Sequence, residues 1–219
     1  MSLLDFARGP ALQWSLIIFV FGVVWRIVGA ALLMRTRDFS KARVSSGDRV
    51  KGGVRTILTR SVPPETFEKR IRFQFITGSL WHIGYFAVVL LFVPHILFFE
   101  SFLGFGWPGL PNPVILVIGA ITLATLVALL VRRMIHPVLK IISTADDYIS
   151  WVVATLPLIT GFLAMAHLGL RYETMLAIHI LSFELLLIWF PFGKLMHLFF
   201  VFPSRYNVGA IFARRGVRV

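Results

Sequence analysis

Four histidines lie inside apolar stretches of the sequence, where an imidazole has few polar partners. They are His82, His95, His179 and His197. His179 and His197 are eighteen residues apart, so on one continuous helix both imidazoles leave the same face about 27 Å from each other. That rise is close to the hydrocarbon thickness of a bilayer, about 30 Å. Two helices with one histidine near each membrane face predict two haem groups, one above the other, each held by a pair of imidazoles.

The composition indicates an integral membrane protein. Of the 219 residues, 58% are hydrophobic and 15% are charged, which leaves too few polar residues to cover a soluble domain. The absence of cysteine excludes disulfides, thiolate-bound iron–sulfur clusters and covalently attached c-type haem. The net charge of +12 is confined to a few segments. It therefore indicates membrane topology, and we expect contact with membrane lipid and none with nucleic acid.

Five apolar segments are each long enough for a membrane-spanning helix, which needs about 20 residues. They cover residues 11–34, 73–99, 113–131, 148–166 and 174–201. The sequence therefore predicts an all-α integral membrane protein, with one five-helix bundle that forms a single domain over residues 1–219. The first segment is too long for a signal-peptide core and has no clear small-residue cleavage site, so we expect it to be retained.

Basic residues alternate sharply between the connections. Residues 35–72 contain eleven Lys or Arg residues, whereas residues 100–112 contain none. Because Lys and Arg accumulate in cytoplasmic connections, we expect the N-terminus outside and the C-terminus in the cytoplasm, in a multi-pass protein of the inner (cytoplasmic) membrane. We expect Gly52, Gly53, Pro63 and Pro64 to break up the basic cytoplasmic loop 35–72. This loop either enforces the topology alone or also docks an acidic cytoplasmic partner.

This topology sets the depth of each histidine and therefore the pairing. His82 and His197 lie near the cytoplasmic side, whereas His95 and His179 lie near the outer side. We expect a proximal haem b between His82 and His197 and a distal haem b between His95 and His179. Two imidazoles fill both axial positions of the iron, which favours electron transfer over oxygen chemistry.

Spacing alone leaves the outer ligand of the second helix open. His95 lies thirteen residues after His82, about 140° around an ideal helix. It also follows Pro94, which bends a helix. The bend either turns His95 toward the fifth helix or leaves it a packing residue in a protein with one haem. His167, at the end of the fourth segment, is the alternative ligand, and we expect His136 at the membrane interface.

Charged residues inside the apolar segments are candidate partners of the haem groups. Arg26 lies in the first segment and Lys194 lies one turn before His197, where each could bind a haem propionate or extend to the membrane surface. Glu184 is an acid deep in the fifth segment. It either accepts a proton from a quinol or pairs with Arg26.

Three short stretches resemble the gamma subunit of respiratory nitrate reductase. Leu80–Gly84 is similar to the haem-ligating second helix of that family, and Phe190–His197 is similar to the end of its fifth helix. Ser143–Asp147 is similar to the start of its fourth helix. The resemblance covers about Trp14 to Tyr206. The broader family includes membrane cytochromes of sulfite-reductase-linked and heterodisulfide-reductase-like complexes.

The resemblance implies a dihaem b-type membrane cytochrome subunit. Such a subunit passes electrons between the quinone pool and an iron–sulfur subunit on the cytoplasmic side, which serves a further catalytic subunit. Quinol is expected near the outer haem, between His95, His179 and the loop 107–112, although quinone reduction is the reverse possibility. The longer spacing between His82 and His95, the lack of a lysine in the loop after the second helix and the longer first loop favour a relative of nitrate reductase. The alternative is a haem-free membrane anchor or small transporter with a histidine proton path.

Overall fold

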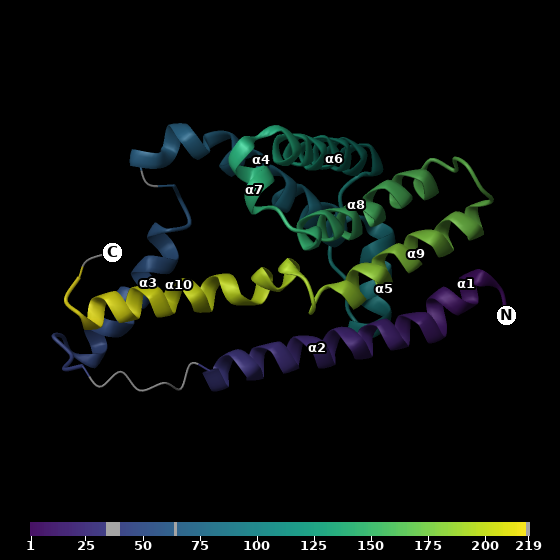
Figure 1. Ribbon diagram of the computed structural model, residues 1–219. Coiled ribbons are helices and arrows are strands. Elements are labelled where there is room, and N and C mark those ends of the chain that lie inside the picture. The colour runs from purple at the N-terminus through teal and green to yellow at the C-terminus, as the bar shows by residue number, and fades with distance from the viewer. Residues whose placement is uncertain (34–39, 64, 218–219) are drawn as a thin grey trace. The chain divides into compact units, whose positions relative to one another are not determined.

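The computed structural model describes residues 1–33, 40–63 and 65–217, and its regular elements there are helices (Figure 1). Five helices are long and apolar enough to cross a membrane. They span Leu3–Leu33, Glu68–Leu91, Asn112–Ile135, Ala145–Met165 and Tyr172–Trp189. The all-α class and the presence of five candidate membrane-spanning helices are therefore confirmed, while the orientation of the termini stays a prediction. The predicted end of the first helix, Met34, and residues 35–39 of the basic loop lie outside the described residues.

The chain divides into two compact units. One unit contains residues 1–15 and 72–186, and the other contains residues 16–71 and the chain from Leu187 onward. The first unit therefore holds most of α4 (Glu65–Leu91) together with α5 (Val93–Leu103), α6 (Asn112–Ile135), α7 (Pro137–Ile142), α8 (Ala145–Met165) and most of α9 (Tyr172–Trp189). The second unit holds most of α2 (Leu12–Leu33), together with α3 (Ser46–Thr59), the short turn η2 (Lys194–Met196) and α10 (His197–Arg214). That both units form one domain stays a prediction.

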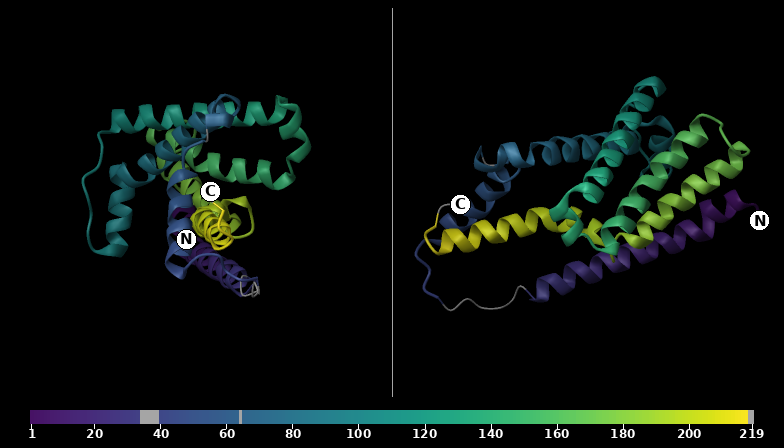
Figure 2. Two further views of the ribbon diagram at one scale, coloured as in Figure 1. Left: turned by 90° about the vertical axis from the view of Figure 1, so that its left-hand side faces the viewer. Right: turned by 45° about the horizontal axis from the view of Figure 1, so that its top comes forward.

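The predicted second apolar segment, residues 73–99, is wrong at its C-terminal end, because α4 ends at Leu91. The acidic residues Glu65 and Glu68 after two prolines predict a helix start near Glu65, and α4 begins there. Phe92 is extended, with φ −81° and ψ 123°, and α5 starts directly after it. The reason is Pro94, which has no backbone N–H for the helix ladder and whose ring would clash with the Leu90 carbonyl of a continuous helix. The chain changes direction at this break (Figure 2).

The predicted fifth helix, residues 174–201, is two helices. α9 ends at Trp189, and α10 begins at His197 after a short 3₁₀ turn. Pro191 cannot donate to the helix ladder. The amides of Phe192 and Gly193 both turn back to the Trp189 carbonyl oxygen, at 3.0 and 3.1 Å.

This break changes the first inference drawn from the histidines. The argument that His179 and His197 leave one helix face required a continuous helix between them, and that argument is wrong. His179 lies inside α9, whereas His197 is the first residue of α10. The depth of His197 relative to His179 is therefore set by the turn at residues 190–196 as well as by helix rise.

Part of the predicted basic loop 35–72 is also helical. α3 begins after Ser45, whose hydroxyl accepts a hydrogen bond from the Asp48 amide at 3.2 Å. Gly52 and Gly53, which we expected to interrupt this segment, lie inside α3. They are accommodated there because α10 packs directly against them.

The crossing of α4 and α6 depends on one missing side chain. A Cβ added at Gly84 would overlap the Thr122 hydroxyl of α6, whereas a Cβ at Gly78 would meet open space. We expect Gly84→Ala to destabilise the protein by about 1–3 kcal/mol through overpacking. The check is the thermal unfolding midpoint in detergent. Gly78→Ala, on the same helix, is the matched control, and an equal midpoint for both variants would contradict this crossing.

Candidate functional site

Two of the four predicted ligands face each other in the first unit. The ring centroids of His95, on α5, and His179, on α9, are 6.0 Å apart, and the two ring planes differ by 14°. The residues are 84 positions apart in the sequence, so the fold and not local spacing brings them together. This pair is the one expected to hold the outer haem.

The position of His95 follows from the helix break. α4 ends at Leu91, and Phe92 is extended before α5 begins. The Nδ1 atom of His95 donates to the Val88 carbonyl oxygen, in the last turn of α4, at 3.1 Å. The Phe92 ring lies edge-on to the imidazole, with centroids 5.1 Å apart. The break therefore both turns His95 and fixes the orientation of its ring.

The loop after α5 donates hydrogen bonds to backbone carbonyls at the same break. Pro94 leaves the Leu90 carbonyl without its helical donor, and the Trp107 indole N–H donates to that oxygen. The Leu110 amide donates to the Leu91 carbonyl at 2.8 Å. The Trp107 ring also stacks on Phe99, with centroids 5.9 Å apart. The loop and α5 therefore form one ordered element beside His95.

His179 is fixed by α8, which lies beside α9 in Figures 1 and 2. Its Nδ1 is 3.2 Å from the Thr160 hydroxyl. That hydroxyl donates to the Leu156 carbonyl at 2.8 Å, so it accepts the hydrogen bond from Nδ1. Ser182 lies 2.9 Å from the same hydroxyl. Gly161 faces the ring, because an added Cβ there would lie 3.1 Å from Cε1 of His179.

These hydrogen bonds select one tautomer at both histidines. A neutral imidazole that donates from Nδ1 carries its lone pair on Nε2. Metal-ligating histidines typically donate their other ring N–H to an oxygen in this way, which fixes both the tautomer and the ring orientation. His95 uses a carbonyl oxygen for this purpose, and His179 uses a hydroxyl oxygen.

The spacing of the two rings fits a shared metal ion. Metal–imidazole bonds of about 2.0 Å on opposite sides of one ion would place two ring centroids about 6 Å apart, which matches the observed 6.0 Å. Within residues 1–33, 40–63 and 65–217, no group of three or more His, Asp or Glu side chains is placed to hold a metal ion. A porphyrin supplies the remaining metal ligands itself, so the donor set of His95 and His179 fits a haem.

The expected inner ligands have the same local chemistry. Nδ1 of His82 donates to the Gly78 carbonyl at 2.6 Å, and Nδ1 of His197 donates to the Lys194 carbonyl at 2.8 Å. The Trp81 ring lies 4.0 Å from that of His82, centroid to centroid. His82 belongs to the first unit and His197 to the second, so their pairing stays a prediction.

The remaining histidines lie at turns. His167 is exposed after α8, with φ 53°, and its ring packs on Tyr172 with centroids 4.9 Å apart. His136 joins α6 to α7, and its Nδ1 is buried without a hydrogen-bond partner among the described residues. The ring of His179 lies beside that of His95, whereas the ring of His167 packs on Tyr172 at the start of α9.

The three charged residues that we expected near the haem groups have different surroundings. Arg26 and Lys194 are exposed residues of the second unit, and their contact with haem propionates stays a prediction. Glu184, in the first unit, is 3% exposed, and its Oε1 has no hydrogen-bond partner within the described part of the chain. Its pairing with Arg26 stays a prediction too.

Sequence reasoning missed Thr160, Gly161 and the Val88 carbonyl as parts of this site. Hydroxyl and small residues are common in membrane helices for packing reasons, so neither Thr160 nor Gly161 carried a distinctive signal. Val88 contributes only its backbone. The one usable signal was Pro94, which predicts orphan carbonyls in the turn before it.

One relative covers nearly the whole chain. A protein of Nitratidesulfovibrio vulgaris (strain Hildenborough), described as "Protein", is 33% identical over 217 residues, which is 96% of this chain and 94% of the relative. No family model matches the chain, and no solved structure matches it. With this identity over almost the full length of both proteins, the chain belongs to the same protein family as the Nitratidesulfovibrio vulgaris protein.

Proposed function

We propose that this chain is a dihaem b-type membrane cytochrome subunit that passes electrons between the quinone pool and a cytoplasmic-side iron–sulfur partner. The observation that carries the proposal is the His95–His179 pair, with parallel rings 6.0 Å apart and both Nδ1 atoms engaged by oxygens. A haem b held there supplies reversible one-electron chemistry. The five apolar spans and the resemblance to membrane cytochromes b support the same function.

The residues around this pair hold the ligands in place. Val88 and Thr160 fix the two ring orientations. Because such oxygens also raise the basicity of the ligating nitrogen, they would tune a haem iron held there. Gly161 leaves space beside the His179 ring that a larger residue would fill.

A pocket on the face of α5 opposite His95 is the candidate site for a quinone ring. It is open and lies between α5 and the loop at residues 106–109, and Val93, Ile96 and Trp107 contribute to its lining. Glu100 is the acidic side chain in it, and its carboxylate lies against Gly106. A quinol bound here loses two electrons and two protons on becoming a quinone. Glu100 would accept a proton from one quinol hydroxyl and pass it to water at the pocket mouth, and the other hydroxyl would release its proton to water directly. The two electrons would leave one at a time to the haem b proposed at His95 and His179.

The decisive test of this function is the haem content of the purified protein. We expect two haem b groups per chain in a pyridine haemochrome assay on protein expressed with ample haem precursor. A preparation with one haem per chain would mean that only one of the two proposed histidine pairs binds haem. A colourless preparation would overturn the proposal as a whole.

A small change beside His179 tests the geometry more finely. In Gly161→Ala, the new Cβ lies 3.1 Å from Cε1 of His179, so the ring must shift by a few tenths of an ångström. We expect two haems to bind, with an altered midpoint potential and altered low-spin electron paramagnetic resonance signal for one of them. Gly29→Ala, which introduces a Cβ into open space, is the control and leaves both haems unchanged. Identical spectra for both variants would contradict haem binding at His179.

A proton path is the second candidate function, and Glu184 is the observation that favours it. A buried carboxyl with an unpartnered oxygen in a membrane helix is a typical feature of proton relays. This alternative predicts a haem-free protein whose proteoliposomes conduct protons. Conduction should be lost in Glu184→Gln. The haem assay separates the two functions directly.

A further inference from the structure

The second unit contains a pair of packed helices from distant parts of the chain. α3 and α10 pack against each other along their length in antiparallel directions (Figure 1). The Arg43 amide, before α3, donates to the Arg214 carbonyl at the end of α10, at 2.9 Å. At the other end, the Arg205 guanidinium donates to the Ser61 hydroxyl at 3.0 Å. Both ends of α3 are therefore fastened to α10.

Glycines hold the two backbones close together. A Cβ at Gly52 would overlap Ala213, and a Cβ at Gly209 would overlap Thr56. A Cβ at Gly53 would lie 2.5 Å from the Tyr206 ring. Such interlocking fixes the rotation of α3 about its own axis, so the opposite face of α3 points away from α10.

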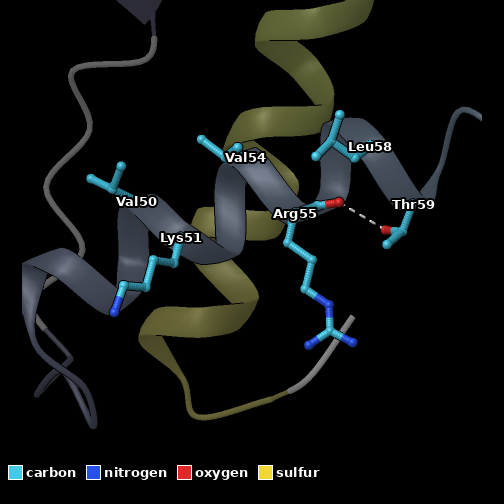
Figure 3. A pocket seen from close by; sticks show the side chains of 6 residues that line it. All are labelled: Val50, Lys51, Val54, Arg55, Leu58 and Thr59. Carbon is cyan, nitrogen blue, oxygen red and sulfur yellow. Dashed lines mark hydrogen bonds between the residues drawn. The ribbon is translucent and has the colours of Figure 1, made fainter.

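That opposite face is apolar and exposed. Val50, Val54 and Leu58, which we call the apolar stripe, are spaced four residues apart and are 50%, 48% and 69% exposed. Lys51 and Arg55 flank the stripe, and Figure 3 shows these side chains projecting from α3. A helix with an apolar stripe and basic flanks has the pattern of helices that lie in the membrane–water interface.

We propose that the apolar stripe of α3 lies in the headgroup region of an anionic lipid bilayer. The charges of α3 and its immediate flanks favour this occupant, because Arg49, Lys51, Arg55 and Arg60 outnumber Asp48. The cytoplasmic leaflet carries anionic lipids that attract such basic segments.

The length of the connecting chain also favours the bilayer over a soluble protein. Eight residues separate Thr59, the end of α3, from Glu68, where the next apolar span begins. Even fully extended, that connection reaches about 30 Å. The stripe is therefore tethered close to a membrane surface in every copy of the protein. This inference does not depend on haem binding.

The absence of cysteine makes the test clean, because one introduced cysteine gives one labelled site. The probe is a nitroxide at Val54→Cys in the full-length protein, reconstituted in nanodiscs of phosphatidylcholine with or without phosphatidylglycerol. We expect the ratio of oxygen to water-soluble nickel-chelate collisions to rise several-fold when phosphatidylglycerol is present. A label at Ser46→Cys, which is exposed at the start of α3 and does not line the pocket around the stripe, is the matched control and stays accessible to the chelate.

Charge removal provides the second arm. Lys51→Gln with Arg55→Gln, in the Val54→Cys background, removes the flanking charges without touching the glycines that pack on α10. We expect the lipid-dependent rise to disappear, which supports the proposal. A label at residue 54 that stays accessible to the chelate in both lipids would overturn it and leave the stripe as a surface for a protein partner. A rise that persists after charge removal would equally overturn recognition of anionic lipid.

Discussion

Replacing either His95 or His179 by alanine is expected to lower the haem content from two groups per chain to one. The two rings lie 6.0 Å apart, centroid to centroid, on α5 and α9, and each would supply one nitrogen ligand to the same iron. Loss of either ligand leaves an incomplete site, as metal binding depends on a complete ligand set. The measurement is the pyridine haemochrome assay, combined with counting the low-spin signals by electron paramagnetic resonance.

His167→Ala is the matched control for these variants. It removes a histidine from the same end of the α8–α9 hairpin, but its ring packs on Tyr172 in the turn. We expect both haems to be retained in it. Loss of a haem in His167→Ala, with full content in His95→Ala, would exchange the two assignments and contradict the site described above.

The orientation of His179 tests the same site without removing a ligand. Thr160→Val removes the hydroxyl that accepts from Nδ1 while keeping a similar shape. Loss of an outer-shell hydrogen bond to a ligating histidine typically weakens metal affinity by about 10–100-fold. We expect one haem to become easily extracted by apomyoglobin while the other stays bound. Equal extraction of both haems from Thr160→Val and the unaltered protein would argue against this role for Thr160.

The apolar spans were predictable because they depend on composition over about 20 residues, which tertiary contacts do not alter. The change in the direction of His95 relative to an unbroken helix was partly predictable for a different reason. Pro94 removes a backbone donor wherever it lies, so a bend there is a local consequence of one residue. The sequence could not say where the bend would direct the imidazole, because that depends on the Val88 carbonyl and on α9.

The break before His197 illustrates the opposite error. Pro191 and Gly193 were visible in the sequence, but membrane helices tolerate proline and glycine when neighbouring groups satisfy the backbone. The eighteen-residue spacing of the two histidines then favoured one continuous helix. In the structure the backbone folds back on the Trp189 carbonyl, and the helix ends. Periodicity gives a residue's face only where the helix is unbroken.

The glycine pair of α3 was misinterpreted for a similar reason. Two adjacent glycines usually favour a turn, because they lose much backbone entropy in a helix. At Gly52 and Gly53 this cost is offset by close packing on α10, which lies more than 140 residues away in the sequence. No local pattern contains that contact, so the helix could not be predicted from the segment itself.

Replacing His82 or His197 by alanine is expected to remove the other haem and leave the His95–His179 haem in place. The turn at residues 190–196 does not prevent this pairing, because it places His197 at the start of a new helix whose direction α9 does not fix. We expect each single variant to retain one haem that quinol still reduces. Electron delivery to a cytoplasmic-side acceptor should fall to the background rate, because the remaining haem lies at the outer side.

Double variants test the pairing itself, since two ligands of one haem are not independent. His82→Ala with His197→Ala should retain one haem, as each single variant does. His82→Ala with His179→Ala should retain none. If His82→Ala with His197→Ala instead gives a haem-free protein, these two histidines serve different haems and the predicted pairing by membrane depth is wrong. The haem-free variant also serves as a control, because the five apolar spans should still insert without cofactor and its helical content should match that of the unaltered protein.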